Sequence, residues 1–398
     1  MKEIKFKEEA AALADEIIEW RRQIHAYPEL GCKEFKTANL IADVLRELDI
    51  EVETEVGDTG VVGVLNGDDN GPTIALRADM DALPIQEGTD LPYASQNDGV
   101  MHACGHDAHV AMVLGVAKLL TEIEIKLPGN IKFIFQPNEE QPPGGAKGMI
   151  SDGVLANPNV DAIAALHVNP QLPTGMLAVK EGPIMAAADK FTVKIKGQGG
   201  HGAAPHQTVD PIIVTTHVIQ ALQTIVSRQV DPLEAVVLSI GELQGGSSFN
   251  VIAEEVNFAG TVRTLNSELR KKMPQLIEKT ISGVVDSFNA EYDLTYEKGY
   301  PILNNDKEMV NYLEDVSDQI IGKRKTLQLN NPSMGGEDFA YYAQKVPGVF
   351  AHLGVGKSSG EIYPWHHPKF NLDEAALSMG TAILGQLAYD YLLDQSKS

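Results

Sequence analysis

The segment MHACGHDAH, residues 101–109, holds the densest group of side chains able to bind a metal ion. It contains Cys104 and three histidines, His102, His106 and His109, directly before an apolar run. Thiolate and imidazole are strong ligands for borderline metals such as zinc. This density of ligand types indicates a metal site, although histidines in such a segment are also compatible with loop and helix-cap positions.

Acidic side chains and another histidine follow three short apolar runs elsewhere in the chain. They are Asp79 and Asp81 after TIALRA, Glu139 and Glu140 after IKFIFQ, and His167 at the end of DAIAALH. Taken singly, a histidine at a strand end is more often an interior or loop side chain. In open parallel sheets, however, ligands bind at the carboxyl ends of the strands. If these runs are parallel strands, their end residues share one edge, which His366 and His367 of YPWHHP could complete.

The adjacent acids Glu139 and Glu140 could divide two roles between them. Neighbouring carboxylates in an exposed loop are usually just solvated, but Pro137 ends the preceding strand and holds this pair at its tip. A hydrolytic metal site needs one carboxylate that coordinates and a second, unligated one that accepts a proton from water. Asp81 then suits a supporting position, where it accepts a hydrogen bond from a ligating imidazole and fixes its tautomer.

A further set of candidates lies in the middle of the chain. The glycine-rich stretch GQGGHGAAPH contains His201 and His206, either as part of a surface loop or as an imidazole that polarises a substrate carbonyl. Asn250 and Arg263 lie near the ends of expected strands. The guanidinium of Arg263 offers a fork of donors that matches a carboxylate, although an ordinary surface position is equally compatible with either residue.

Two styles of hydrophobic patterning indicate two domains. Up to residue 185 and again after residue 300, apolar runs alternate with helical segments, which is typical of a largely parallel sheet covered by helices. Between them, the pattern follows the β-α-β-β-α-β order of a ferredoxin-like module. The sequence therefore predicts an α/β domain formed by 1–185 and 300–398, with 186–299 inserted. The expected helices cover 7–26, 35–48, 210–228, 266–289 and 373–393, and the expected strands include 73–78, 131–136, 161–168, 235–244, 251–264, 291–299 and 349–356.

Length and composition set the frame for these motifs. A chain of 398 residues exceeds what one hydrophobic core usually serves. Its formal net charge of -23 argues against a nucleic-acid partner, because few cations are available to displace counterions from phosphates. The N-terminus lacks the apolar core of a signal peptide, and no apolar run approaches the ~20 residues of a membrane span. We therefore expect a cytoplasmic protein without membrane contact, in which Cys32 and Cys104 are not disulfide-bonded.

The ordered motifs RADMDALP, MHACGHDAH, FQPNEE, ALHV, GGHGAAPH, MGGEDFAYY and HHPKFNLDEAAL resemble those of the aminoacylase and carboxypeptidase G family of metallohydrolases. The resemblance covers nearly the whole chain and is specific to the amidohydrolase branch, with its hippurate hydrolases, bacterial N-acyl-amino-acid deacylases and plant auxin-conjugate hydrolases. It implies two divalent ions, zinc or manganese first and cobalt or nickel as alternatives. The implied ligands are Cys104, as a bridge, with His106, Glu140, His167 and His367.

The resemblance also implies roles for residues that do not bind metal. Glu139 would be the general base, and Asp81 would orient a ligand. Asp79 stands where other branches carry a histidine ligand, so it remains outside the ligand set. The smaller domain would act as a lid and mediate homodimerisation, sending His201 to the partner's active site. Asn250 and Arg263 would bind the substrate carboxylate, with Gly336 of the GGED segment near the same pocket.

These features together predict metal-dependent hydrolysis of the amide bond of N-acyl amino acids. A metal-activated water would lose a proton to Glu139, which would then protonate the leaving amine, while His201 helps to polarise the carbonyl. A metallo-dipeptidase or carboxypeptidase acting on short peptides is an alternative, because the same site can perform both reactions. A non-catalytic metal-binding homologue is a third possibility. Asn138 and the run Gln141 to Pro143 depart from the family pattern and leave the choice of substrate open.

Overall fold

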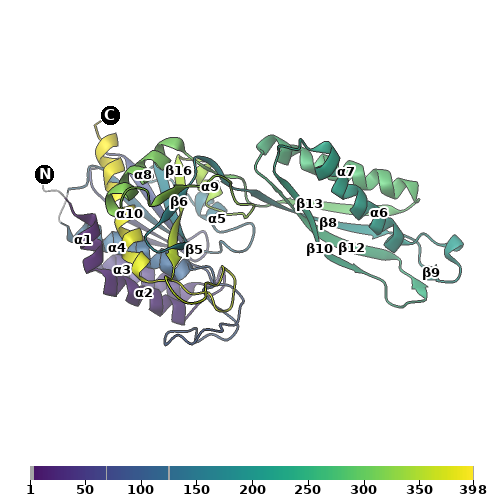
Figure 1. Ribbon diagram of the computed structural model, residues 1–398, viewed down its shortest axis with the longest axis horizontal. Coiled ribbons are helices and arrows are strands. Elements are labelled where there is room, and N and C mark those ends of the chain that lie inside the picture. Colours follow the sequence, from purple (N-terminus) through teal and green to yellow (C-terminus); the bar gives the residue numbers. More distant parts are fainter. Residues whose placement is uncertain (1–3, 69, 124–125, 398) are drawn as a thin grey trace. The chain divides into compact units, whose positions relative to one another are not determined.

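The computed structural model describes residues 4–68, 70–123 and 126–397, and the chain divides into two compact units (Figure 1). Unit 1 consists of Met1–Ile184, Asn304–Asn331 and Asp338–Ser398, whereas unit 2 consists of Met185–Leu303 and Pro332–Glu337. The inserted domain expected over 186–299 thus corresponds to unit 2, with boundaries that differ by a few residues. The sequence did not indicate the short second segment of unit 2, and this segment carries Gly336, which was expected in the first domain.

Unit 1 is built on an eight-stranded sheet with the strand order β1-β2-β4-β3-β5-β16-β6-β15. The strands are β1 (Glu51–Val56), β2 (Gly60–Leu65), β3 (Thr73–Asp79), β4 (Asn130–Gln136), β5 (Ala162–Pro173), β6 (Leu177–Val179), β15 (Thr326–Gln328) and β16 (Gly348–Gly356). The four central strands, β4, β3, β5 and β16, run parallel to one another, and antiparallel pairings occur toward the two sides. The predicted α/β class with a mostly parallel central sheet is therefore confirmed.

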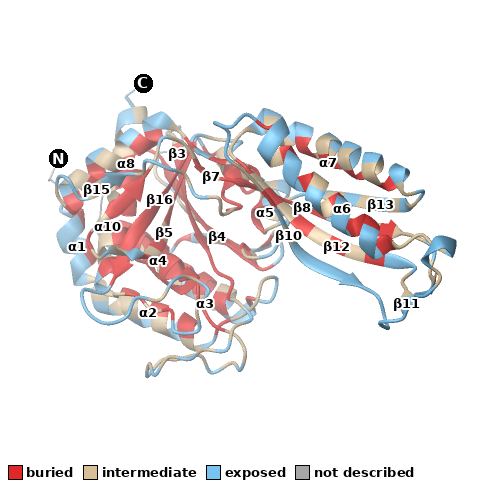
Figure 2. Cartoon of the chain, turned by 45° about the vertical axis from the view of Figure 1, so that its right-hand side comes forward, coloured by how far each residue is buried: buried red, intermediate tan, exposed pale blue. Residues whose placement is uncertain are grey.

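Of the central strands of unit 1, β3, β4 and β16 are buried along their whole length, and β5 is buried over its first five residues (Figure 2, red). Such continuous burial is expected when helices cover both faces of a parallel sheet. The helices are α1 (Phe6–Ala12), α2 (Ala14–Ala26), α3 (Phe35–Glu47), α4 (His106–Glu122), α5 (Ala146–Ser151), α8 (Lys307–Ile320), α9 (Ala340–Ala343) and α10 (Ala375–Gln395). The single helix expected over 7–26 is in fact two helices, which meet at Leu13. Within the described ranges, no helix combines the length and apolar composition needed to cross a bilayer.

Unit 2 has the predicted β-α-β-β-α-β order. Its elements are β8 (Ala187–Lys196), α6 (Pro211–Thr224), β10 (Val236–Gly245), β12 (Glu255–Thr264), α7 (Ser267–Ser287) and β13 (Glu291–Lys298). The strands form an antiparallel sheet in the order β10-β12-β8-β13, whose alternate residues pack against the two helices. Asp210 and Asn266 cap α6 and α7 by accepting hydrogen bonds from the first free backbone N–H groups. A short turn of π-helix (Ile225–Gln229) follows α6.

Two pairs of short strands and a 3-10 turn are the remaining elements. β7 (Gly182–Met185) pairs with β14 (Leu303–Asn305) where the chain passes between the units, and β9 (Gly200–His201) pairs with β11 (Val251–Ile252) within unit 2. A 3-10 turn (Pro205–Gln207) follows β9. The strand β9 carries His201, one of the candidate site residues.

Candidate metal centre

The carboxyl ends of the parallel strands in unit 1 bring the predicted side chains together. Asp79 ends β3 and lies in register with Gln136, the last residue of β4, while His167 lies on the neighbouring strand β5. The helix α4 begins at His106, close to the same edge. The expectation that these strand ends share one edge is therefore met, and the edge carries sulfur, imidazole and carboxylate groups.

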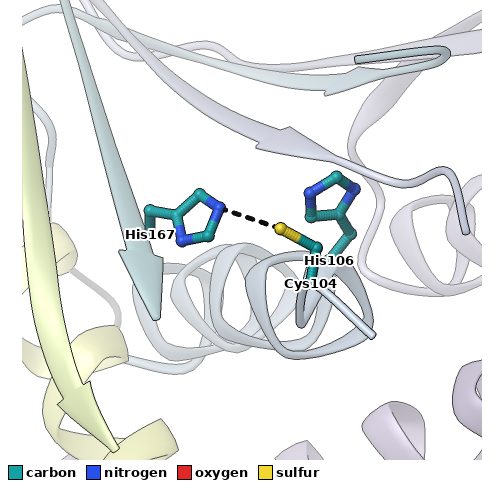
Figure 3. Close-up of side chains that lie close together, drawn as sticks. All are labelled: Cys104, His106 and His167. Atoms are coloured by element: carbon teal, nitrogen blue, oxygen red, sulfur yellow. Dashed lines mark hydrogen bonds between the residues drawn. The ribbon is translucent and has the colours of Figure 1, made fainter. Parts of the chain in front are cut away.

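Cys104, His106 and His167 form the centre of this group (Figure 3). Cys104 and His106 are buried, His167 is largely buried, and one ligand atom from each lies within 4.8 Å of the others. The sulfur of Cys104 lies 3.4 Å from Nε2 of His167. Nδ1 of His167 donates to the carbonyl of Val168 at 2.9 Å, so Nε2 presents its lone pair toward the sulfur. Burial lowers the pKa of His167 well below its ordinary value, which keeps the ring neutral.

His106 is oriented by Asp81, as the sequence predicts. Its Nδ1 lies 3.2 Å from Oδ1 of Asp81, and the other oxygen of Asp81 accepts a hydrogen bond from the backbone N–H of Glu140 at 3.0 Å. Nε2 of His106 is buried and finds no hydrogen-bond partner in the described part of the chain. Burial disfavours protonation of His106, but the carboxylates of Asp79, Asp81 and Glu140 overcome it and raise its pKa to about 10. The same negative field would attract a cation.

The turn after β4 presents the paired acids. Asn138 has a φ of 52°, a left-handed conformation that asparagine tolerates better than alanine does, which accounts for its presence there. Its backbone N–H donates to Glu34, and its carbonyl accepts from Gly145, so the turn is held on both sides. Beyond it, Glu139 is buried and lies within 4.8 Å of the ligand atoms of His106 and Glu140.

Glu140 and Cys104 complete a donor set that fits divalent cations. Burial opposes ionisation of Glu140, but His366 and His106 outweigh it and lower its pKa, so this group is a carboxylate. Burial raises the pKa of the Cys104 thiol well above its ordinary value, and Glu140 and Glu139 act in the same direction. A bound cation would reverse that effect, because a coordinating thiol is deprotonated. Nε2 of His106 and Oε1 of Glu140, both buried without a hydrogen-bond partner among the described residues, are free to coordinate.

The last expected ligand differs from the prediction by one residue. His366, not His367, lies beside the group, with its Nε2 3.3 Å from Oε1 of Glu140 and within 4.8 Å of the ligand atom of Cys104. Its backbone N–H donates to the carbonyl of Ala103, which fixes it next to the cysteine. His366 has a φ of 62°, and this left-handed turn sends the next side chain elsewhere.

His367 has a different environment. Its ring stacks on Tyr363 with centroids 4.6 Å apart, and its Nδ1 accepts a hydrogen bond from the backbone of Lys369. The structure therefore separates two adjacent histidines that look alike in sequence. We call Cys104, His106, Glu139, Glu140, His167 and His366 the unit 1 cluster.

The sequence did not single out two other residues that lie close to this cluster. His352 on β16 is in register with His167, and its Nδ1 is buried with no hydrogen-bond partner among the residues described. Trp365 packs edge-on against His167 at 5.5 Å and donates to the carbonyl of Val168. For His352, the available signal was its place on a strand that lies beside β5 in the sheet.

The candidates in unit 2 fall into two separate places. His201 pairs with Val251 across β9 and β11, and the carbonyl of Asn250 accepts from the backbone of Gly202, so His201 and Asn250 lie at one end of the unit. Arg263 lies near the opposite end of β12, about 26 Å along the strand if each of eight residues adds roughly 3.3 Å.

Gly336 accompanies Arg263 rather than the glycine-rich turn. A methyl group added to Gly336 would lie 3.3 Å from Nη1 of Arg263. Within one unit 2, therefore, Asn250 and Arg263 do not lie close enough to bind the same carboxylate, contrary to the simplest interpretation of the sequence. The chain returns to unit 1 two residues after Gly336, at Asp338.

Comparisons with known proteins identify the family. Residues 75–390 match the model of peptidase family M20/M25/M40. The chain is 42% identical to an N-acetyl-L-cysteine deacetylase of Bacillus subtilis, over 97% of this chain and 90% of that protein. It is 40% identical to thermostable carboxypeptidase 1 of Saccharolobus solfataricus, over 97% and 98% of the two chains. A crystal structure from Bacillus subtilis, described as a dinuclear metal-binding peptidase of the M20 family, superimposes with a TM-score of 0.83 at 37% identity, covering 96% of this chain and 99% of that one. This chain therefore belongs to peptidase family M20/M25/M40, in agreement with the motifs and with the cluster of candidate ligands at the sheet edge.

Proposed function

We propose that this protein hydrolyses the amide bond of small N-acyl amino acids and that two divalent cations assist the reaction at the unit 1 cluster. The observation that carries the proposal is the combination of a complete donor set with one additional buried carboxylate, Glu139. A purely structural metal site has no use for an acid beside its ligands. The similarity to a deacetylase over nearly the whole chain supports the same reaction class.

The residues that would hold the cations are Cys104, His106, Glu140 and His167, with His366 in the place first assigned to His367. Two overlapping groups share Cys104, one with the imidazoles of His106 and His167 and the other with Glu140 and His366. This sharing supports Cys104 as a bridge between two ions. When bound, the cations would acidify a water molecule and polarise the amide carbonyl. Mixed sulfur, nitrogen and oxygen donors are compatible with zinc or manganese, and with cobalt or nickel.

Glu139 would move the proton. It is buried and lies next to the ligand atoms of His106 and Glu140, so a water held there is within its reach. As general base it would accept a proton from that water, and as general acid it would deliver the proton to the leaving amine. Asp81 would keep Nε2 of His106 free by accepting from the opposite ring nitrogen.

Unit 2 would supply substrate contacts and a dimer interface. Its edge strand β10 is exposed, and large apolar side chains are exposed around it and on α6. They are Ile212, Ile213, Leu233, Leu243, Phe249 and Val251. Edge strands and apolar patches of this kind are typical of interaction surfaces, and a second copy of the chain would cover both.

A dimer would also explain the separation of candidates within unit 2. Arg263 would bind the substrate carboxylate, whereas His201 and Asn250, at the far end of unit 2, would act in the site of the partner. His201 is exposed, and its Nδ1 accepts from the backbone N–H of Ala203, so Nε2 can carry the proton that polarises a carbonyl.

The test is a substrate panel on protein stripped with a chelator and then reloaded with zinc, manganese, cobalt or nickel. We expect release of the amino acid from N-acetyl amino acids and hippurate in the reloaded protein and no release in the stripped protein. A matched dipeptide with a free amino group should react more slowly. Faster reaction with dipeptides would favour the carboxypeptidase or dipeptidase alternative, and the similarity to a carboxypeptidase makes this comparison necessary. No reaction with any metal would favour a non-catalytic metal-binding protein.

A further inference from the structure

His109 lies among candidate metal ligands, but both of its ring nitrogens are already hydrogen-bonded within the protein. It is buried, and one of its ring nitrogens lies within 4.8 Å of the ligand atoms of Asp79 and His106. However, its Nε2 accepts a hydrogen bond from the backbone N–H of Val168 at 2.9 Å. A backbone N–H can only donate, so Nε2 carries no proton.

The other ring nitrogen is also engaged. Nδ1 of His109 lies 2.5 Å from Oδ1 of Asp79 and must carry the single ring proton, since Nε2 does not. Each nitrogen thus has a partner that fits its protonation: Nδ1 carries the proton, and the lone pair of Nε2 is taken by the N–H of Val168, so neither nitrogen is left for a cation.

Asp79 is fixed in turn by a buried network. Nη1 of Arg77 donates to Oδ2 of Asp79 at 2.6 Å, and Nη2 donates to Asp338 at 2.8 Å. The side chain of Gln136 accepts from Nε of Arg77 and donates to Asp338. Arg77, Asp79, Gln136 and Asp338 are all at most 2% exposed. A continuous chain of charge-assisted hydrogen bonds therefore runs from Asp338 to His109 and holds its ring in one orientation.

The backbone that His109 holds is the one that orients His167. The N–H of Val168 donates to His109, while the carbonyl of Val168 accepts from Nδ1 of His167. The two rings also pack together, with centroids 4.6 Å apart. Any shift of this peptide group would turn the Nε2 of His167 away from the sulfur of Cys104.

We propose that His109 and Asp79 are positioning residues that bind no cation and that hold the Val168 peptide group, thereby aiming His167 at the metal centre. This inference rests on the proposed function in one respect, since it takes His167 as a ligand. Supporting groups of this kind typically change metal affinity or activity by 10- to 100-fold when they are removed.

The experiment compares His109→Leu with His109→Gln, because the Gln side chain can still accept a hydrogen bond from Val168, whereas Leu cannot. We expect His109→Leu to bind two equivalents of zinc at saturation, but with one affinity weakened about 10- to 100-fold in a chelator competition, and with a lower kcat at a similar KM. His109→Gln should recover most of both losses. Asp79→Asn, which leaves the ring of His109 in place, should show an intermediate loss.

A second readout does not depend on the loaded enzyme. In metal-free wild-type protein labelled with 15N-histidine, His109 should show a protonated Nδ1 and an unprotonated Nε2, and these resonances should keep that pattern when zinc is added. If zinc shifts Nε2 of His109 as it shifts Nε2 of His106, or if both His109 variants lose one equivalent of zinc even at saturation, His109 is a ligand and the proposal is wrong. A lower Tm with unchanged zinc affinity and kcat would also overturn it, since the role would then be purely structural.

Failure of the positioning role can be distinguished from failure of the proposed amidohydrolase function. A wild-type protein that binds zinc with the expected tautomer of His109, yet hydrolyses none of the panel, would refute the amidohydrolase assignment. The positioning role would still be supported by the zinc affinities of the Leu and Gln variants.

Discussion

The two units present their functional side chains in opposite ways. In unit 1, the candidate ligands gather beside the carboxyl ends of the buried strands β3 and β4, and their supporting partners, such as Asp81 and Arg77, are buried and hydrogen-bonded. In unit 2, His201 ends the short strand β9 and Asn250 lies in a turn; both are exposed, and their side chains accept hydrogen bonds from near neighbours, Ala203 and Ser248. A rigid edge suits ions that demand fixed geometry, whereas exposed turns suit groups that meet a substrate or a partner chain.

Glu139→Gln should give the largest effect and tests the chemical role of the unit 1 cluster. We expect kcat to fall by about 10²- to 10⁴-fold, the range typical of losing a general base, because an amide cannot accept the proton from water. Zinc stoichiometry and Tm should stay close to those of the wild type. Both are measured on the same preparation, by elemental analysis and by thermal unfolding. Near-normal turnover with two bound ions would show that another group is the base.

His201→Ala tests whether the exposed candidate residues of unit 2 take part in catalysis. The loss of a group that stabilises charge in the transition state should lower kcat by about 10²- to 10³-fold, without affecting metal content. Because His201 is exposed and outside the unit 2 core, Tm should not change.

Mixing His201→Ala with the inactive Glu139→Gln chain shows which site His201 serves. If His201 acts in the partner's site, each mixed dimer has one site with both residues intact, so an equal mixture should recover about a quarter of wild-type activity. If His201 acts in its own chain, or if the protein is a monomer, the mixture should stay as inactive as its components.

His366→Ala and His367→Ala form a matched pair within one loop. We expect His366→Ala to weaken the binding of one zinc ion and to lower activity more than His367→Ala does, because only His366 lies beside Glu140 and Cys104. His367→Ala should lose little more than its stacking on Tyr363. Zinc competition with a chelator measures the difference. The reverse ranking would restore the original assignment of His367.

The sequence was informative where periodicity and topology decide the outcome. Strand ends of a parallel sheet must share an edge, so the approach of Asp79, Asp81, Glu139 and His167 to one another followed from the order of apolar runs alone. The ferredoxin-like order of unit 2 followed in the same way, because alternation and helix length are local signals.

Positions in irregular segments could not be predicted in this way. His366 and His367 differ only by which of them adopts the left-handed conformation of the turn, and no pattern in YPWHHP encodes that choice. The segment Pro332–Glu337 joins unit 2 through tertiary contacts, so Gly336 was assigned to the wrong unit. The sequence also predicted that Asn250 and Arg263 both bind the substrate carboxylate, because each residue type suits that role. Their separation depends on where they lie relative to β12, with Asn250 before the strand and Arg263 near its end.

Lys132→Met should have the smallest effect on activity and tests how much a buried ammonium group stabilises unit 1. The ammonium of Lys132, on the strand that leads to Glu139, donates to the carbonyls of Val154, Ala156 and Pro158 at 2.7 to 3.0 Å. Methionine would leave these carbonyls without that donor, so we expect unfolding free energy to fall by about 2–4 kcal/mol. Lys194→Met, which removes an exposed ion pair with Glu255 in unit 2, is the matched control and should change little.

The pH dependence of stability sharpens the same comparison. Burial lowers the pKa of Lys132 from its ordinary value of 10.5 to about 8, so between these two values the unfolded chain binds more protons at this residue than the folded chain. Stability contributed by this group should therefore rise as pH increases from about 8 to about 10.5. Denaturant unfolding across this window should show a rising difference between the wild type and Lys132→Met, and no such rise for Lys194→Met. A flat difference for Lys132→Met would mean that the three carbonyls hold the ammonium fully charged in the folded protein, since they then compensate for the loss of water.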